Sequence, residues 1–227
     1  MNEVESLQST VRGVVDGING DDFEILISTS SSATNQCLKT IYELKDSIPR
    51  LRIVRQERPY VAGAILDAVD FCNSEALIFM AADGETDPRF LSRIIKSYEE
   101  RELDMVATTR WTKGGDFGDY RDSKKLFNGL AQLMCKALYG NFISDWTYGY
   151  RLCRRSALLS CNFKELRHPW FLEQALIASR KKWRVDEVGV TWTKRVEGET
   201  FIRARDFIGY LRPIIRVRFS SIKKLST

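Results

Sequence analysis

The chain has 227 residues, of which 44% are hydrophobic and 29% are charged, as is usual for a soluble globular protein with one large domain. No apolar run approaches the roughly 20 residues that cross a bilayer, and the acidic, polar start is unlike a secretory signal. Five scattered cysteines without a CxxC pair argue against a zinc site or a disulfide framework and indicate a reducing cytoplasm.

The spacing of apolar residues predicts alternating helices and strands over the first part of the chain. In chain order we expect a helix over 3–18, a strand over 23–28, a helix over 35–48, a strand over 51–57, a helix over 62–72, a strand over 75–81, a helix over 88–102, a strand over 103–111 and a helix over 123–140. This alternation predicts the α/β class, with a mostly parallel sheet covered by helices on both faces. The first three strands should be parallel neighbours or near neighbours.

Three carboxylates follow the third predicted strand. In "LIFMAADGETDP" (77–88) an apolar run leads to Asp83, Glu85 and Asp87, and a proline opens the next helix. We expect Asp87 to cap that helix. Asp83 and Glu85 lie earlier, at the carboxyl end of a strand, where open sheets bind ligands. They could form a plain polar turn, or they could bind Mg²⁺ or Mn²⁺, which one or two carboxylates and substrate phosphates typically hold.

The basic residues concentrate at the end of the chain. The net charge is +5, but residues 180–227 contain 13 Lys/Arg and 5 Asp/Glu, a local +8, so the rest of the chain carries −3. An excess confined to one segment indicates a local anionic partner.

Residues 201–224 combine these basic side chains with apolar ones. We predict a helix pair, broken near Pro213, that lies in a membrane interface, where each basic residue near anionic lipid contributes about 1 kcal/mol. The alternative is an amphipathic helix packed on the core of the domain itself. A nucleic-acid partner is not expected, because bulky aliphatic side chains interrupt the arginines.

Five stretches occur in an order that matches a known family. They are "NEVESL" (2–7), "LIFMAADGETDPRFL" (77–91), "ATTRW" (107–111), "DWTYGYRLCRR" (145–155) and "VDEVGVTWTKRVEGET" (185–200). In turn they resemble the YNE start, the DxD-type metal motif, the G-S-R-Y strand, the D-x-T-S-G-F-R element and the late arginine motif of inverting family-2 glycosyltransferases with the GT-A fold. The resemblance covers nearly the whole chain and is closest to dolichol-phosphate mannose synthases and related polyprenyl-phosphate glycosyltransferases.

This resemblance implies which residues carry the chemistry. Asp83 matches the second aspartate of the metal motif and Glu85 matches its glutamine, so both would bind the metal. Arg110 matches the arginine of G-S-R-Y and would meet the acceptor phosphate. Asp145 and Arg151 match the D-x-T-S-G-F-R element and would complete a catalytic set with Asp83 and Arg110.

Further residues are implied on the substrate side. Arg121 lies near the next family arginine, and Arg195 matches the phosphate-side arginine of the late motif. Thr29 and Ser30 stand where an acidic pair ends the second family strand, in the region that holds the nucleoside. For each arginine the alternative is a solvated surface charge.

The chain also departs from the family pattern. Ala81 stands where the family has its first metal-motif aspartate, and Lys124 stands at the acceptor-site serine. The apolar first strand of the family is absent, and its loss would leave two neighbouring strands unpaired or force them together. Either the natural chain starts further upstream or the nucleotide pocket has been rebuilt.

The expected function is inverting transfer of a sugar from a nucleotide-sugar donor to a lipid-phosphate acceptor, with Mg²⁺ or Mn²⁺ as cofactor. Residues 1–200 would form the transferase domain, and residues 201–227 would contact the cytoplasmic face of a membrane peripherally. The departures motivate an alternative, a non-catalytic GT-A homologue that binds a partner or a nucleotide. A nucleotidyltransferase is least expected, because the sequence has no glycine-rich phosphate loop.

Overall fold

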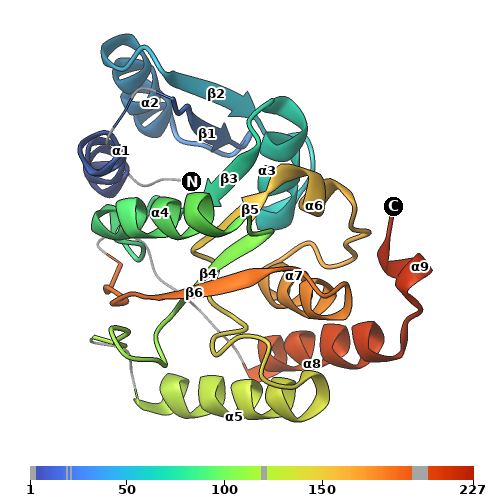
Figure 1. The fold of residues 1–227 in the computed structure, drawn as a ribbon. Coiled ribbons are helices and arrows are strands. Elements are labelled where there is room, and N and C mark those ends of the chain that lie inside the picture. Colours follow the sequence, from blue (N-terminus) through green and yellow to red (C-terminus); the bar gives the residue numbers. More distant parts are fainter. Residues whose placement is uncertain (1–3, 19, 21, 119–121, 196–203) are drawn as a thin grey trace.

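The computed structural model describes residues 4–18, 20, 22–118, 122–195 and 204–227, which form an α/β fold with two sheets (Figure 1). The first sheet is a parallel pair, β1 (Ile25–Thr29) and β2 (Leu51–Arg55). The second has the order β3-β5-β4-β6, formed by β3 (Ala76–Phe79), β5 (Arg151–Arg154), β4 (Met105–Thr109) and β6 (Val185–Gly189). The predicted α/β class is confirmed, and the second sheet is mixed because β5 runs antiparallel to β3 and β4.

The helices are α1 (Glu5–Gly17), α2 (Asn35–Ser47), α3 (Tyr60–Phe71), the short 3-10 helix η1 (Pro88–Phe90), α4 (Leu91–Arg101), α5 (Asp122–Tyr139), α6 (Arg155–Leu159), α7 (Pro169–Arg180), α8 (Ala204–Phe219) and α9 (Ile222–Leu225). The helices as far as α5 follow the predicted alternation, whereas α6 and α7 were not predicted. A further difference from the prediction is at residues 88–102, where one expected helix is a 3-10 turn followed by α4.

Among the residues that the structure describes, the two sheets are not hydrogen-bonded to each other through β1 and β3. β1 and β2 are parallel neighbours, as predicted, whereas β3 begins the other sheet. Within the described ranges β1 and β3 share no strand pairing, and side chains of both line one cavity. β1 and β3 therefore belong to separate sheets on the two sides of this cavity.

Alternate residues of β4 contact two different helices. Met105 and Ala107 pack in one cluster with α7, and Val106 packs in another with Leu91 and Ile94 of α4. This follows from the period of two along a strand, which sends successive side chains to opposite faces. The second sheet therefore lies between α4 and α7.

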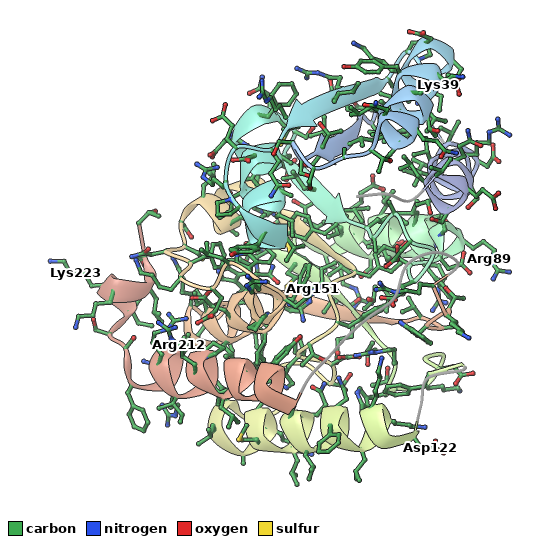
Figure 2. All side chains as sticks on the ribbon, turned by 180° about the vertical axis from the view of Figure 1, so that it is seen from behind. Lys39, Arg89, Asp122, Arg151, Arg212 and Lys223 are labelled. Carbon is green, nitrogen blue, oxygen red and sulfur yellow. The ribbon has the colours of Figure 1, made fainter. Side chains whose placement is uncertain are left out.

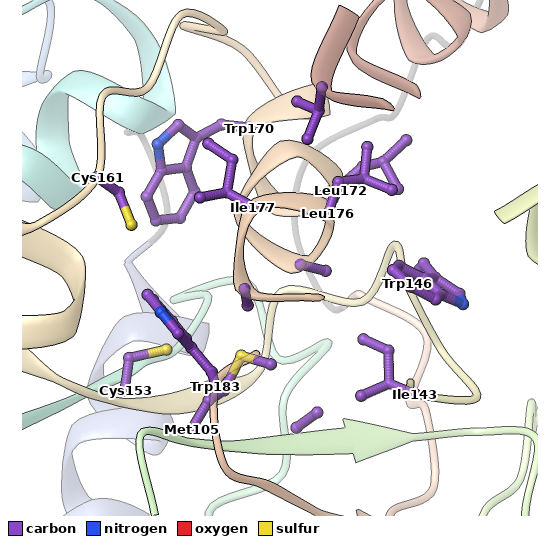
Figure 3. Close-up of a cluster of buried hydrophobic side chains, with 14 of the residues drawn as sticks. Met105, Ile143, Trp146, Cys153, Cys161, Trp170, Leu172, Leu176, Ile177 and Trp183 are labelled. Atoms are coloured by element: carbon purple, nitrogen blue, oxygen red, sulfur yellow. The ribbon is translucent and has the colours of Figure 1, made fainter. Parts of the chain in front are cut away.

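α7 is buried on nearly all sides, as Figure 3 shows for Trp170, Leu172, Leu176 and Ile177. A large apolar side chain buried in this way contributes about 1.5–3 kcal/mol. Because α7 carries few exposed positions, other elements must cover it. α8 provides much of this cover.

The C-terminal helix therefore belongs partly to the core. Ile214 and Val217 of α8 are fully buried in the cluster around α7, and the Tyr139 hydroxyl donates a hydrogen bond to the Ile214 carbonyl. The predicted break near Pro213 is wrong: α8 continues through this proline, and the helix pair separates after Phe219 instead. Packing of the residues that follow Pro213 holds the helix together. No helix among the described residues is both long and apolar enough to cross a bilayer.

Candidate active site at the carboxyl end of β3

The loop after β3 is fixed by its own backbone contacts. The Thr86 hydroxyl donates to the Ala81 carbonyl and accepts from the Ala81 amide, both at 3.1 Å, which closes the turn. Gly84 has a φ of +85°, a left-handed conformation that glycine adopts without strain. Asp87 accepts a hydrogen bond from the Arg89 amide at 2.9 Å, which confirms the predicted cap of the next helix.

Asp83 and Glu85 come together on one guanidinium. The Asp83 carboxylate accepts from the Glu85 amide at 3.0 Å, which turns both side chains toward Arg195. Arg195 Nη2 lies 3.0 Å from Asp83 Oδ2, and its Nε lies 2.9 Å from Glu85 Oε1. We call Asp83, Glu85 and Arg195 the carboxylate–arginine cluster. Burial raises the pKa of Asp83, because desolvation disfavours the charged form more than the nearby Arg195 favours it.

Arg195 reaches these carboxylates from a separate part of the chain. It follows β6, and the Thr193 hydroxyl donates to the Gly84 carbonyl. On another side of the loop, the Tyr148 hydroxyl donates to the Glu85 carbonyl at 3.1 Å. The backbone of the loop is thus held from two sides by contacts that do not involve the carboxylates themselves.

A second ion pair lies deeper in the molecule. Arg110, directly after β4, donates to Asp145 through Nε at 2.7 Å and through Nη2 at 3.0 Å. Its guanidinium lies 4.5 Å from the centre of the Tyr148 ring and 5.0 Å from that of Phe117. Such planar, two-point pairing fixes both position and orientation. We call Arg110, Asp145 and Tyr148 the buried arginine cluster.

The loop that carries Asp145 is supported by several neighbouring elements. Gln132 of α5 accepts from the Trp146 amide at 2.8 Å, and Asn128 donates to the Thr147 hydroxyl at 2.8 Å. Glu187 of β6 accepts from the Ser144 amide at 2.8 Å. Asp145 therefore has little freedom to move.

Arg151 is fully buried, and it lies near the middle of the molecule in the rear view of Figure 2. It donates to the Phe171 carbonyl and to Gln174 Oε1, both at 2.7 Å, and to the Trp146 carbonyl at 2.9 Å. Complete burial lowers the pKa of Arg151 to about 10. Its contacts join the 145–147 loop to α7, so its observed contacts are those of a positioning residue.

One continuous cavity of about 2200 Å³ joins the two clusters and extends to the space between β1 and β3. Its polar lining includes Asp83, Glu85, Arg110, Lys124, Asn128, Tyr148, His168 and Arg195. Asp145 and Arg151 are fully buried behind this lining. The cavity is large enough for a nucleotide sugar and part of an acceptor, since small-molecule sites typically occupy about 300–1,000 Å³.

The remaining predicted residues are less directly connected to the cavity. Thr29 is buried at the end of β1, and its carbonyl accepts from the Gln56 amide at 2.8 Å. The Ser30 hydroxyl lies 2.8 Å from that of Ser32. Neither residue lines the cavity, although the preceding Ser28 does. Arg121 lies outside the described residues.

Tyr148 and Thr193 were not among the predicted site residues. Tyr148 connects the two clusters, with its ring against Arg110 and its hydroxyl on the loop of Asp83 and Glu85. A usable signal existed, since Tyr148 lies three residues after Asp145 in "DWTYGY". Thr193 has no such signal, because its partner is a backbone carbonyl more than a hundred residues away in the chain.

The carboxylates fit a metal ion only in part. No group of three or more His, Cys, Asp or Glu residues in the described ranges could hold one. Ala81 offers no oxygen ligand from its side chain, and Asp83 and Glu85 both pair with Arg195. Two carboxylates suit Mg²⁺ or Mn²⁺ when substrate phosphates supply further ligands. The residues therefore fit a cation shared with a bound diphosphate, not one held by the protein alone.

Comparison with known proteins defines the class. Residues 1–160 match the model of glycosyl transferase family 2, so the chain belongs to this family. It is 24% identical to an undecaprenyl-phosphate mannosyltransferase of Micrococcus luteus, over 88% of this chain and 83% of the relative. It is 21% identical to a dolichol-phosphate mannosyltransferase of Pyrococcus furiosus, over 95% of this chain but only 61% of that longer relative.

Solved structures confirm the GT-A-like fold. Two structures of glucosyl-3-phosphoglycerate synthase from Mycobacterium tuberculosis give TM-scores of 0.72 and 0.74 at 14% identity, over 96% and 97% of this chain and 76% of theirs. One contains Mn²⁺, UDP-glucose and phosphoglyceric acid, and the other contains Mn²⁺, UDP and phosphoglyceric acid. At this identity the likeness establishes the fold alone.

Proposed function

We propose that this glycosyltransferase moves a sugar from a nucleotide-sugar donor to a polyprenyl phosphate, with inversion at the anomeric carbon. The observation that carries the proposal is the orientation of Arg110. A buried aspartate fixes this arginine beside a cavity that also contains Asp83 and Glu85. One cavity thus offers a site for a diphosphate and a fixed cation for a second phosphate. The names of the two curated relatives support a polyprenyl-phosphate acceptor.

On the donor side, Asp83 and Glu85 would hold a divalent cation together with the donor diphosphate. When bound, Mg²⁺ or Mn²⁺ would supply charge neutralisation for the departing nucleoside diphosphate. Mn²⁺ with UDP in the solved structures of similar fold supports this assignment. Tyr148 and Thr193 keep the loop of Asp83 and Glu85 in place.

On the acceptor side, Arg110 would orient the lipid phosphate, and Lys124 would add positive charge. A phosphate oxygen attacks the anomeric carbon, and the bond from that carbon to the diphosphate oxygen breaks with its electron pair leaving on the diphosphate. Because the phosphate is already anionic, the step requires no strong general base. Asp145 is fully buried and paired with Arg110, so its role would be to position this arginine.

A peripheral membrane contact would bring the protein to such an acceptor. On α5, four exposed apolar side chains follow helical spacing: Leu126, Phe127, Leu130 and Leu133 are 65%, 55%, 51% and 64% exposed. Ile215 and Phe219 of the neighbouring α8 are exposed too. Figure 1 shows α5 and α8 at the end of the molecule opposite β1 and β2. An apolar face with basic residues around it suits the cytoplasmic surface of an anionic membrane.

This contact can be tested with vesicles. Wild type should co-sediment with anionic vesicles and be released by salt, since exposed charges are screened over about 8 Å at physiological ionic strength. The double variant Leu130→Gln/Leu133→Gln should lose binding, whereas Tyr42→Gln on α2 should retain it. A wild-type protein that ignores anionic vesicles at low salt would refute the membrane contact.

The transferase activity itself requires a donor and acceptor screen. UDP-, GDP- and dTDP-sugars, mannosyl donors included, should be combined with a short polyprenyl phosphate and Mg²⁺ or Mn²⁺. We expect glycolipid with one donor class, and none with the corresponding polyprenol, which lacks the phosphate. Nucleotide binding without turnover of any donor would instead support the non-catalytic homologue. Transfer to the polyprenol would remove the role proposed for Arg110.

A further inference from the structure

Arg195 occupies the place that a cation would need. A single guanidinium contacts both carboxylates, with Nη2 toward Asp83 and Nε toward Glu85, at 3.0 and 2.9 Å. A divalent ion shared by the same two carboxylates would require the same oxygen atoms. Because like charges repel strongly at such distances, Arg195 and the ion cannot both remain there.

The geometry also allows Arg195 to leave. The side chains of Arg195 and Glu85 are each 24% exposed, and that of Asp83 is 12% exposed. The loop does not depend on the ion pair for its shape, because Thr86, Tyr148 and Thr193 hold its backbone. Departure of the guanidinium would therefore expose two carboxylates that are already oriented.

We propose that Arg195 is an exchangeable counter-ion, which neutralises Asp83 and Glu85 in the absence of substrate and transfers to the donor diphosphate when a divalent cation binds. This inference rests on the proposed donor site. A diphosphate offers Arg195 a new partner with the planar, two-point geometry that guanidinium groups prefer. The cation gains the carboxylates in the same event, so neither partner is left without an opposite charge.

The exchange makes binding cooperative in a specific way. The cation alone must displace Arg195 from both carboxylates, and therefore binds weakly. The nucleoside diphosphate alone finds Arg195 engaged with the carboxylates. Together they satisfy all charges, so each should increase the affinity of the other by the same factor, which for such coupling is about 5–150-fold.

The test measures Mn²⁺ binding by electron paramagnetic resonance, with and without UDP or GDP, on the whole chain. For wild type we expect weak Mn²⁺ binding that the better nucleoside diphosphate strengthens about 5–150-fold. Arg195→Met should bind Mn²⁺ alone more tightly than wild type, and the coupling factor should fall to the part that comes from direct contact between Mn²⁺ and the diphosphate. Arg195→Lys should be intermediate, because one ammonium group cannot offer the same two planar contacts.

Arg89→Met provides the matched control. Arg89 pairs with Asp87 at 2.6 Å in the same loop, but this pair lies outside the carboxylate–arginine cluster. Its loss should leave Mn²⁺ binding and coupling unchanged. Thermal unfolding of each variant identifies any that fails to fold, and Arg195→Lys then serves in place of Arg195→Met.

The outcomes separate this inference from the proposed function. If Arg195→Met binds Mn²⁺ no more tightly than wild type, the exchange is refuted, even if the enzyme transfers sugar. If Arg195→Met binds Mn²⁺ more tightly while wild type transfers no sugar, the counter-ion role stands and the proposed activity fails. Equal coupling in wild type and Arg195→Met also overturns the exchange.

Discussion

The two arginine–carboxylate clusters have similar hydrogen-bond lengths but different surroundings. Arg110 and Asp145 are 4% and 0% exposed, whereas Arg195 and Asp83 are 24% and 12% exposed. The buried pair also has aromatic rings against its guanidinium and amide partners around its carboxylate. Distance alone therefore does not distinguish a permanent pair from one that can open; burial and the number of additional partners do.

This difference follows from the cost of moving charge out of water. Once a charge is buried, removing its partner leaves it without either water or an opposite charge, which is strongly unfavourable. A partly exposed charge regains water when its partner leaves, so separation costs little. The buried arginine cluster thus belongs to the framework, and the carboxylate–arginine cluster belongs to the part that can change.

The largest predicted effect comes from Asp145→Ala. This change removes the carboxylate that pairs with the buried Arg110 guanidinium, so the free energy of unfolding should fall by about 3–5 kcal/mol. Chemical denaturation measures this loss. Glu102→Ala removes an exposed pair, in which Arg184 and Glu102 are 55% and 84% exposed, and should cost less than about 1 kcal/mol. Equal losses in the two variants would contradict the comparison.

An ion pair that is buried on one side only joins α7 and α8. Glu173 is fully buried and lies 2.8 Å from Arg216, which is 25% exposed, and it also accepts from the Lys164 and Glu165 amides. Glu173→Ala should lower the free energy of unfolding by about 2–3 kcal/mol, because two amides lose their acceptor while Arg216 keeps its pair with Glu165 at 2.9 Å. A negligible loss by chemical denaturation would show that α8 is not integral to the core.

A smaller and more specific effect is expected from Tyr148→Phe. Loss of its hydroxyl removes one hydrogen bond to the Glu85 carbonyl, worth about 1 kcal/mol. Tyr150→Phe is a matched control, because its hydroxyl donates to the Asp87 carbonyl at the same distance of 3.1 Å. Stability should fall similarly in both, but calorimetry should show weaker binding of nucleoside diphosphate with Mn²⁺ only in Tyr148→Phe. Equal binding losses would mean that the tyrosines stabilise the loop without acting on the site.

The sequence predicted local structure better than it predicted contacts. Apolar periodicity located the helices and strands as far as α5, and the Asp-Pro pair predicted the cap at Asp87, because these features depend on neighbouring residues. It gave none of the elements from β5 to β6. The reversed direction of β5 depends on how the chain returns after α5, which no local pattern encodes. The continuation of α8 through Pro213 likewise depends on packing against α7.

Only part of the predicted set of site residues lines the cavity, and the sequence did not give their arrangement. The motifs identified Asp83, Glu85, Arg110 and Arg195, which all line the cavity. They gave no indication that Asp145 pairs with Arg110 behind the cavity wall. Nor did they indicate that Arg195 neutralises the carboxylates, since ion pairs between distant segments depend on the tertiary fold.

The smallest predicted change in stability is that of Arg195→Met. Because Arg195 and Glu85 are partly exposed, water replaces the lost contacts, and the free energy of unfolding should change by less than about 1 kcal/mol. The sign of this change depends on two opposing effects. Loss of the attraction between Arg195 and the two carboxylates destabilises the fold, whereas removal of a partly desolvated cation stabilises it. Chemical denaturation of Arg195→Met beside Asp145→Ala measures both clusters on one scale. A loss in Arg195→Met as large as that in Asp145→Ala would mean that the carboxylate–arginine cluster is also part of the framework, and Arg195 would then be too costly to displace.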